Sequence, residues 1–425
     1  MNIRFYNARI LPLVDGSLEL VEGELWVQGN RIAYVGPRRP FDGVWDREID
    51  VQGNLLMPGF KNAHTHSPMT FLRSYADDLP LHDWLNRQVF PMEAKLSGED
   101  CYWQSRLAIL EYLTSGITAN FDMYFHPDQV AQASIDSGFR TVLCGDINDF
   151  GGTVEEIERR YLHFNRCHEL IGYRLGFHGE YTTGVPILEG MASLAKKYHA
   201  PVYTHLLETQ VESTGCLERH GKTPAVYLDS LGMFDYGGGG FHCVYMSGGD
   251  LEVFREKGLW AVTNPGSNCK LASGVAPVQR MLDMGIRLAI GTDGPASNNC
   301  LDFFREMFLV TGLQKVYNLD AASTDAGQVL RMACQGGAQA MGLTQCDCLA
   351  PGQLADLIEI DLHQPNMQPL NNIAKNVVYS GSKQNVKRTM VNGKLLYEEG
   401  RFFVNADPEE IYAKVNESIR AKRGQ

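Results

Sequence analysis

The chain has 425 residues, of which 44% are hydrophobic and 21% charged, the usual balance for a globular protein with a sizeable core. Its formal net charge of −12 disfavours a nucleic-acid partner, because binding to a phosphate backbone needs basic surface stripes. The first residues lack the pattern of a signal peptide, and no stretch resembles a membrane span. Ten cysteines without a disulfide-like spacing favour reduced thiols, so we expect a cytoplasmic protein with no membrane partner.

Both ends of the chain predict β structure. Near the N-terminus the β-rich runs are 3–11, 24–27, 31–35 and 49–56, with a hairpin turn at Gly29-Asn30. Near the C-terminus they are 356–362 and a hairpin over 386–398. We therefore expect one small β-sandwich domain built from residues 1–58 and 346–405. A closing helix is expected within 406–425, where apolar residues recur at helical spacing.

The middle of the chain, residues 59–345, alternates short apolar runs with helix-like stretches such as 97–115 and 188–198. The predicted strands end near His64, Asp122, Cys144, His178, His205, His242, Asn264 and Asp293. Eight strand–helix repeats predict an α/β fold of the (β/α)₈ TIM-barrel type. Such a barrel places its active site at the carboxyl ends of the strands, which is where these polar residues recur.

A metal site is predicted from four of these strand ends. In a strand, residues i and i+2 point the same way, so His64 and His66 can face one ion. Two histidines at this spacing are more often surface residues when they stand alone. Here His205 and Asp293 close later strands, and three imidazoles with one carboxylate suit a single Zn²⁺, although Fe²⁺ accepts the same ligands.

Two further residues suit hydrolysis at such a metal. A divalent metal lowers the pKa of a bound water to about 7, and hydroxide attack on an aromatic C–NH₂ carbon then needs protons to be moved. Glu208, three residues after His205, is the candidate general acid/base that protonates the ring nitrogen. His242 would orient the hydroxide, and Asp293 would also relay a proton. Taken alone, Glu208 could be a solvated loop carboxylate and His242 a satisfied core histidine.

Several motifs together resemble the 5-methylthioadenosine/S-adenosylhomocysteine deaminase family of the amidohydrolase superfamily. They are Pro58-Gly59-Phe60 with His64-Thr65-His66, the stretches 73–81 and 91–96, His205-Leu206-Leu207-Glu208-Thr209, His242-Cys243-Val244, and the stretches 264–274, 291–299 and 351–357. The resemblance runs nearly from end to end of the chain.

The resemblance implies hydrolytic deamination of an adenine nucleoside. The implied substrates are adenosine, 5′-deoxyadenosine and 5′-methylthioadenosine, with S-adenosylhomocysteine less favoured. It implies that Glu93 grips the ribose hydroxyls and that His178 touches the nucleoside. Binuclear relatives carry a lysine at the position of His178, so one divalent metal per subunit is expected here. A homo-oligomer is also expected.

Two positions depart from the family pattern. Gly145 and Thr153 stand where members that accept S-adenosylhomocysteine carry arginines for its carboxylate. Asp146, Asp149 and Glu180 lie nearby in the sequence, and Glu180 reads equally well as a substrate contact or as a solvated loop acid. An arginine such as Arg140, or one from a neighbouring subunit, could instead take over the missing contact.

Other functions compatible with the sequence remain open. A deaminase or hydrolase of guanine, a pterin or a triazine would use the same metal chemistry but has no need of Glu93 on a ribose. A catalytically inactive barrel scaffold would have lost some of the predicted metal ligands, and all four of them are present in this sequence. A nucleoside-binding sensor would keep Glu93 without needing Glu208.

Overall fold

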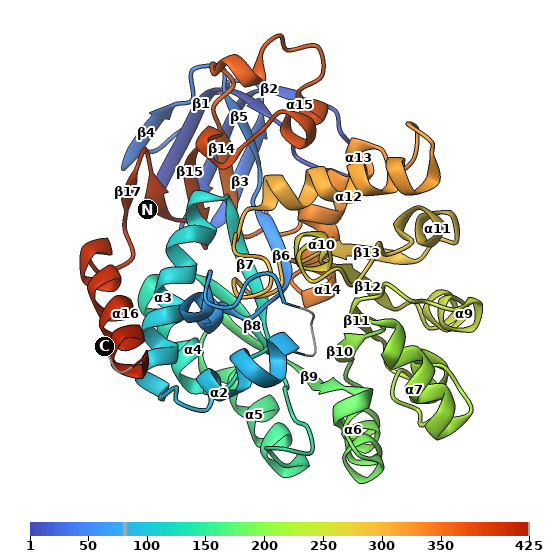
Figure 1. Ribbon diagram of the computed structural model, residues 1–425. Coiled ribbons are helices and arrows are strands. Elements are labelled where there is room, and N and C mark those ends of the chain that lie inside the picture. The colour runs from blue at the N-terminus through green and yellow to red at the C-terminus, as the bar shows by residue number, and fades with distance from the viewer. Residues whose placement is uncertain (80–82, 424–425) are drawn as a thin grey trace.

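The structure is a computed structural model of the 425-residue chain, and it describes all residues except 80–82 and 424–425. Two sheets organise it: an eight-stranded parallel barrel surrounded by helices, and a mixed sheet beside it (Figure 1). Pro80 and Leu81 of the stretch 73–81, and the last two residues of the expected closing helix, lie outside the described residues.

The barrel strands follow one another in sequence order and are all parallel, as the alternating pattern predicts. They are β6 (Phe60–Thr65), β7 (Ile117–Asp122), β8 (Arg140–Cys144), β9 (Ile171–Gly179), β10 (Val202–Leu206), β11 (Gly238–His242), β12 (Trp260–Thr263) and β13 (Arg287–Ile290). Side-chain and backbone bonds bring the last strand back to the first. Thr292 N–H donates to Asn62 Oδ1 at 2.9 Å, and Asp293 N–H donates to His64 O at 3.0 Å.

Helices cover the outside of the barrel (Figure 1). The longer ones are α3 (Gly98–Thr114), α4 (Pro127–Ser137), α5 (Val154–Cys167), α6 (Val185–Tyr198), α7 (Gln210–His220), α9 (Gly248–Lys257) and α12 (Phe303–Asn318). The shorter ones are α2 (Phe90–Glu93), α8 (Pro224–Ser230), α10 (Pro265–Lys270), α11 (Val278–Asp283), α13 (Ala326–Arg331) and α14 (Gly337–Met341). Ser97 begins α3 with a capping box to Asp100, the local signal that starts a helix there.

The mixed sheet combines strands from both ends of the chain, as the two β-rich ends predict. Its order is β17 (Arg401–Phe402), β16 (Lys394–Glu398), β15 (Val386–Val391), β14 (Leu357–Ile360), β5 (Leu55–Pro58), β1 (Asn2–Ile10), β2 (Val21–Gln28) and β3 (Arg31–Gly36), with β4 (Arg47–Asp50) also on β1. The antiparallel pair β5–β14 joins the N-terminal strands to the C-terminal ones.

The expected single run over 49–56 is wrong, because the structure divides it between β4 and β5. Gln52 and Gly53 between them have φ angles of 56° and 76°, which turn the backbone out of the extended conformation. Hydrophobicity continues across this turn because Val51 is buried in the core of the mixed sheet, so composition alone does not reveal the break.

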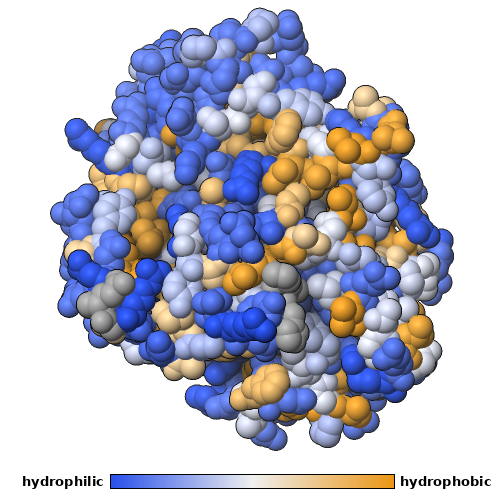
Figure 2. Space-filling model, in the orientation of Figure 1, coloured by the Kyte–Doolittle hydropathy of each residue, from blue (hydrophilic) through white to orange (hydrophobic). Residues whose placement is uncertain are grey.

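The closing helix is α16 (Pro408–Arg423), which packs beside α3 (Figure 1). Ser418 Oγ donates to Asp100 Oδ1 at 2.6 Å, and Lys422 Nζ lies 2.6 Å from Asp100 Oδ2. α15 (Ile373–Tyr379) lies by the mixed sheet and α13. In Figure 2 the visible face is mostly hydrophilic over the mixed sheet, with separate apolar patches elsewhere. Among the described residues, no helix combines the length and apolarity needed to span a membrane.

Candidate active site

The predicted metal ligands all lie at the carboxyl end of the barrel. His64 is in β6 and His66 follows that strand directly, His205 is in β10, and Asp293 lies three residues beyond β13. Parallel strands direct their carboxyl ends to one edge, so residues more than 200 positions apart in the chain meet there.

The ligand atoms of these residues converge on one point. His66 Nε2 lies 3.1 Å from Asp293 Oδ1, and His64 Nε2 lies 3.4 Å from the same oxygen. His205 Nε2 lies 3.4 Å from His66 Nε2. The ligand atoms of His64, His66 and Asp293 all lie within 4.8 Å of one another, and so do those of His64, His205 and His242. Such spacing leaves room for one central cation.

The outer ring nitrogens show how the imidazoles are oriented. His66 Nδ1 bonds to Met123 O at 2.5 Å, and His205 Nδ1 bonds to His178 O at 2.8 Å. A carbonyl only accepts, so each Nδ1 carries a proton and each Nε2 faces the centre. His64 is buried with neither ring nitrogen hydrogen-bonded, an arrangement that fits a cation as its missing partner.

Burial favours the neutral form of two of these histidines. It lowers the pKa of His64 to about 3 and lowers the pKa of His205 well below its usual range. For His66, burial also lowers the pKa, but the hydrogen bond and charge of Asp293 outweigh it and raise the pKa to about 9. Metals bind the deprotonated ligand, so a cation here displaces the proton that His66 shares with Asp293.

Glu208 and His242 lie next to this centre. Glu208 follows β10 by two residues and His242 ends β11, and His242 Nε2 lies 3.8 Å from Glu208 Oε2. Both side chains are buried, and burial raises the pKa of Glu208. His242 has a φ of 74°, a conformation that non-glycine residues adopt mainly where surrounding contacts enforce it.

Glu93 is not the exposed helix acid that its sequence alone would indicate. It ends α2 and is 8% exposed, and its Oε1 accepts a hydrogen bond from Tyr124 Oη at 2.6 Å. Burial raises its pKa to about 7. The ring centroids of Tyr124 and His66 lie 6.2 Å apart, so Tyr124 lies between Glu93 and the histidine cluster.

His178 lies near the end of β9 and contacts the same cluster. Its ring centroid is 4.9 Å from that of His205, and its carbonyl accepts the Nδ1 proton of His205. Its own Nδ1 lies 2.9 Å from Thr182 Oγ1, which leaves Nε2 without a bond to this hydroxyl. Burial lowers the pKa of His178 to about 4, so the ring is neutral.

The structure gives Gly145 and Thr153 specific local roles. A Cβ on Gly145 would lie 2.4 Å from the carbonyl oxygen of Gly176, so the backbone leaves no room for any side chain there. Thr153 begins α5 by accepting a hydrogen bond from Glu156 N–H. Asp146, next to Gly145, is paired with Arg160 at 3.3 Å, and its pKa is raised by burial to about 6.

Two alternatives for the loop region are wrong. Glu180 is not a solvated acid, because it is buried with Arg219 Nη2 at 2.6 Å and His220 Nε2 at 3.2 Å from its carboxylate. Arg140 cannot replace a missing loop arginine, because it begins β8 at the opposite end of that strand and bonds Asp356 through two nitrogens, at 2.8 and 3.1 Å. The remaining acid, Asp149, accepts the backbone N–H of Gly184 at 2.8 Å.

Four polar residues of the site were not assigned roles from the sequence. Ser267 and Ser297 donate to Asp293, and Asn268 and Ser273 bond to His242 and Glu208. All four lie in the motifs 264–274 and 291–299. Their positions in the stretches that follow β12 and β13 could have indicated a role in the site, because the carboxyl ends of the barrel strands face it.

Comparison with known proteins adds independent findings. Residues 55–396 match the model of the amidohydrolase family. A 5-methylthioadenosine/S-adenosylhomocysteine deaminase of Syntrophomonas wolfei is 38% identical, with 100% of both chains covered. A 5′-deoxyadenosine deaminase of Methanobrevibacter smithii is 38% identical over 97% of this chain and 96% of its own. The crystal structure of an adenosine deaminase from Xanthomonas campestris with bound zinc has a TM-score of 0.94 at 30% identity, covering 100% of this chain and 99% of that one.

The fold, the histidine cluster and the family match define the class: the chain belongs to the amidohydrolase family. Within that family it belongs with the 5-methylthioadenosine/S-adenosylhomocysteine deaminases, and it is a hydrolytic deaminase. The resemblance drawn from the motifs, the barrel fold and the enzyme class are thereby confirmed.

Proposed function

We propose that this enzyme hydrolyses the exocyclic amino group of an adenine nucleoside and releases ammonia and the inosine analogue. The observation that carries the proposal is the close approach of His64, His66, His205 and Asp293, with the Glu208 carboxyl group and His242 beside them. Relatives of similar length named as deaminases of adenine nucleosides support the same substrate class.

The four converging residues would hold one divalent cation, and Zn²⁺ is the metal we propose. Three imidazoles and one carboxylate suit zinc, and the structural neighbour from Xanthomonas campestris has zinc bound. When bound, such a metal activates a water molecule at neutral pH. The donor set fits it, since both ring nitrogens of buried His64 lack a hydrogen bond among the described residues.

The other residues would move protons and orient the reactants. Glu208 would give a proton to the ring nitrogen of the purine next to the attacked carbon, because its buried carboxyl group lies beside His242 and the candidate ligands. His242 would orient the water through Nε2, which faces both Glu208 and Asp293. Asp293 would take the remaining proton from the hydroxyl group added to the purine carbon and pass it to the departing ammonia.

Glu93 and His178 would hold the nucleoside. A buried carboxylate can accept hydrogen bonds from both ribose hydroxyls, and Glu93 has one oxygen bonded to Tyr124 and a second oxygen with no bond to it. His178 would contact the nucleoside through its Nε2. Equal activity on free adenine and adenosine would contradict the role of Glu93.

The loop around Gly145 supports a preference for substrates with an uncharged 5′ substituent. Gly145 has no space for an arginine, and Asp146 already binds Arg160 while Glu180 binds Arg219. A carboxylate in the 5′ substituent of a substrate would therefore lie near arginines that are already paired with Asp146 and Glu180, and near those two acids themselves. We propose adenosine, 5′-deoxyadenosine and 5′-methylthioadenosine as better substrates than S-adenosylhomocysteine.

Ammonia release from these four nucleosides, with guanine as a non-nucleoside comparison, tests the proposal. Elemental analysis of the same sample should show about one metal per chain. Two metals per chain, or full activity with none, would contradict the mononuclear site. A cytoplasmic location is proposed from the ten free cysteines. The homo-oligomer stays a prediction for sedimentation analysis.

A further inference from the structure

One short segment of the barrel contacts the active site at three points. It comprises residues 266–273, which form most of α10 and the turn after it. In its middle, Asn268 Oδ1 accepts the Nδ1 proton of His242 at 2.8 Å. This bond fixes the orientation of the ring, with Nδ1 protonated toward Asn268 and Nε2 facing Glu208 and Asp293.

The serines at either side of Asn268 bind the two carboxylates of the site. Ser267 Oγ donates to Asp293 Oδ2 at 2.6 Å, and Ser273 Oγ donates to Glu208 Oε1 at 3.2 Å. Each hydroxyl occupies one oxygen and thereby limits the rotation of that carboxylate. A single segment thus holds the acid, the histidine and the metal-facing carboxylate in one mutual arrangement.

The segment is itself anchored by a buried acid that the proposed reaction does not use. Glu306 of α12 is fully buried, and its carboxylate accepts Gly266 N–H at 2.9 Å and Asn298 Nδ2 at 2.8 Å. Asn298 Nδ2 also donates to Thr292 O at 2.7 Å, next to Asp293. Glu306 therefore ties the segment to the turn that carries Asp293.

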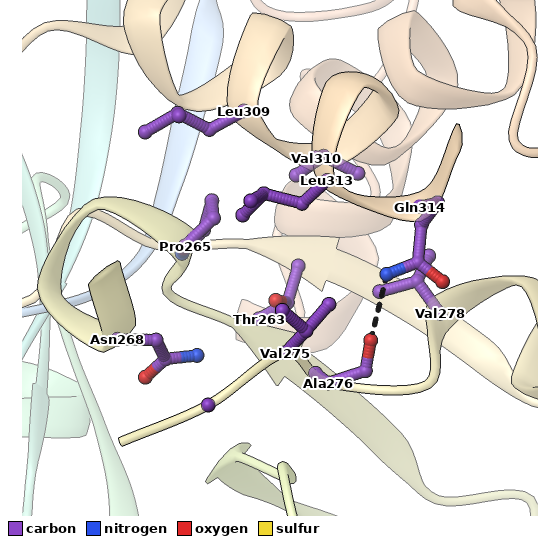
Figure 3. Close-up of a pocket in the computed structure, with 11 residues that line it drawn as sticks. Thr263, Pro265, Asn268, Val275, Ala276, Val278, Leu309, Val310, Leu313 and Gln314 are labelled. Carbon is purple, nitrogen blue, oxygen red and sulfur yellow. Dashed lines mark hydrogen bonds between the residues drawn. The ribbon is translucent and has the colours of Figure 1, made fainter. Parts of the chain in front are cut away.

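The chain that continues beyond the segment packs against α12. Figure 3 shows Asn268, Pro265 and Val275 around a pocket whose other wall is α12, through Leu309 and Leu313. Gln314 of the same helix donates to Ala276 O at 2.8 Å, drawn as a dashed line in Figure 3. Apolar packing and this bond limit the movement of the segment.

We infer that Ser267, Asn268 and Ser273 are positioning residues, and that these three side chains form a preformed frame aligning Asp293, His242 and Glu208 for proton transfer. The inference rests on the proposed deamination for its kinetic consequence, but the alignment itself is a property of the protein without substrate. Alignment of this kind lowers the barrier because the reacting groups need no reorganisation.

Kinetics on 5′-methylthioadenosine test the frame. Asn268→Leu keeps the size of the side chain and removes the acceptor for His242. It should lower kcat by about 10–100-fold with KM little changed, which is the typical effect of removing a residue that orients an active-site histidine. Ser273→Ala should lower kcat, and Ser273→Thr should restore it because the hydroxyl returns. Cys269→Ala is the matched control, since its exposed side chain lies on the same helix, and it should leave kcat unchanged.

A measurement without substrate separates this inference from the proposed function. In zinc-loaded protein with ¹⁵N-labelled histidine, the Nδ1–H signal of His242 should be present in the wild type and in Cys269→Ala. It should be lost or moved in Asn268→Leu. An unchanged signal in Asn268→Leu would overturn the inference. If the signal is lost as expected while the wild type deaminates none of the nucleosides, the frame stands and the proposed function fails.

Discussion

At the base of the site, where the candidate ligands meet, two of the histidines are oriented by backbone carbonyls, whereas at the rim, around Gly145, the acids are paired with side chains. His66 and His205 each donate from Nδ1 to a carbonyl of the barrel, at Met123 and His178. At the rim, Asp146 and Glu180 are paired with arginines of neighbouring helices. A backbone carbonyl stays wherever the barrel forms, while an ion pair changes with a single substitution. The base of the site therefore suits the common chemistry, and the rim suits selection of the substrate.

Loss of one ligand should give the largest effect and tests the base of the site. His205→Ala removes a buried nitrogen from the cluster, so both metal and activity should be lost. We expect the loss of turnover to exceed the about 10–100-fold typical of outer-shell changes. Metal analysis and ammonia release measure the two together. His163→Ala changes an exposed histidine of α5 and should alter neither; a metal-replete, active His205→Ala would contradict the ligand assignment.

Glu208→Gln separates proton transfer from metal binding at the base of the site. An amide of the same shape cannot deliver the proton, so turnover should fall by about 10²–10⁴-fold while the metal stays. Glu218→Gln on the exposed side of α7 serves as the control. A fall of less than about threefold would mean that another residue supplies the proton.

Glu93→Ala tests the proposed hydrogen bonds between Glu93 and the ribose of the substrate. The variant removes the proposed acceptor for the ribose, and hydrogen bonds to charged groups contribute about 1.5–3 kcal/mol. We expect kcat/KM for adenosine to fall by roughly 10–100-fold, chiefly through KM. Tyr124→Phe should show a smaller fall, because it removes only the hydroxyl that holds Glu93. An unchanged KM in Glu93→Ala would place the ribose elsewhere.

The rim is tested by comparing two substrates on the unmodified enzyme. With no arginine at Gly145 or Thr153, S-adenosylhomocysteine lacks a charge-assisted contact of about 1.5–3 kcal/mol. Its kcat/KM should be at least about tenfold below that of 5′-methylthioadenosine. Glu180→Gln, which frees Arg219, should narrow this difference. S-adenosylhomocysteine as the best substrate would show that the rim does not select against a carboxylate.

The last expected effect concerns pH and metal affinity. The pKa of His66 is raised to about 9 in the absence of a cation, so below that pH a proton must leave before metal binds. Apparent affinity should then rise about tenfold per pH unit between pH 6 and 8 and level off near pH 9. Competition titrations with a chelator measure it. A flat profile would mean that His66 binds the metal without losing a proton.

The sequence by itself determined the barrel and the candidate ligands, because their signals are local. Strand and helix periodicity repeats through the middle of the chain, and residues that end parallel strands must meet at one edge of the barrel. That rule brings His64 and Asp293 together although 229 positions separate them. The hairpins at Gly29-Asn30 and Asn392-Gly393 are likewise predicted by turn residues alone and lie where expected.

The tertiary structure alone decided which groups are buried and what they bond to. Glu93 is covered through Tyr124, Glu180 is neutralised by Arg219, and Gly145 is crowded by the backbone of Gly176. Each pair joins residues about 30–40 positions apart on different elements, and no periodic pattern encodes such a contact. The protonation and orientation of an acid depend on these partners, because burial and charge set its pKa. The sequence therefore specified the candidate reaction centre, while tertiary packing decided the burial and the bonding partners of the residues around it.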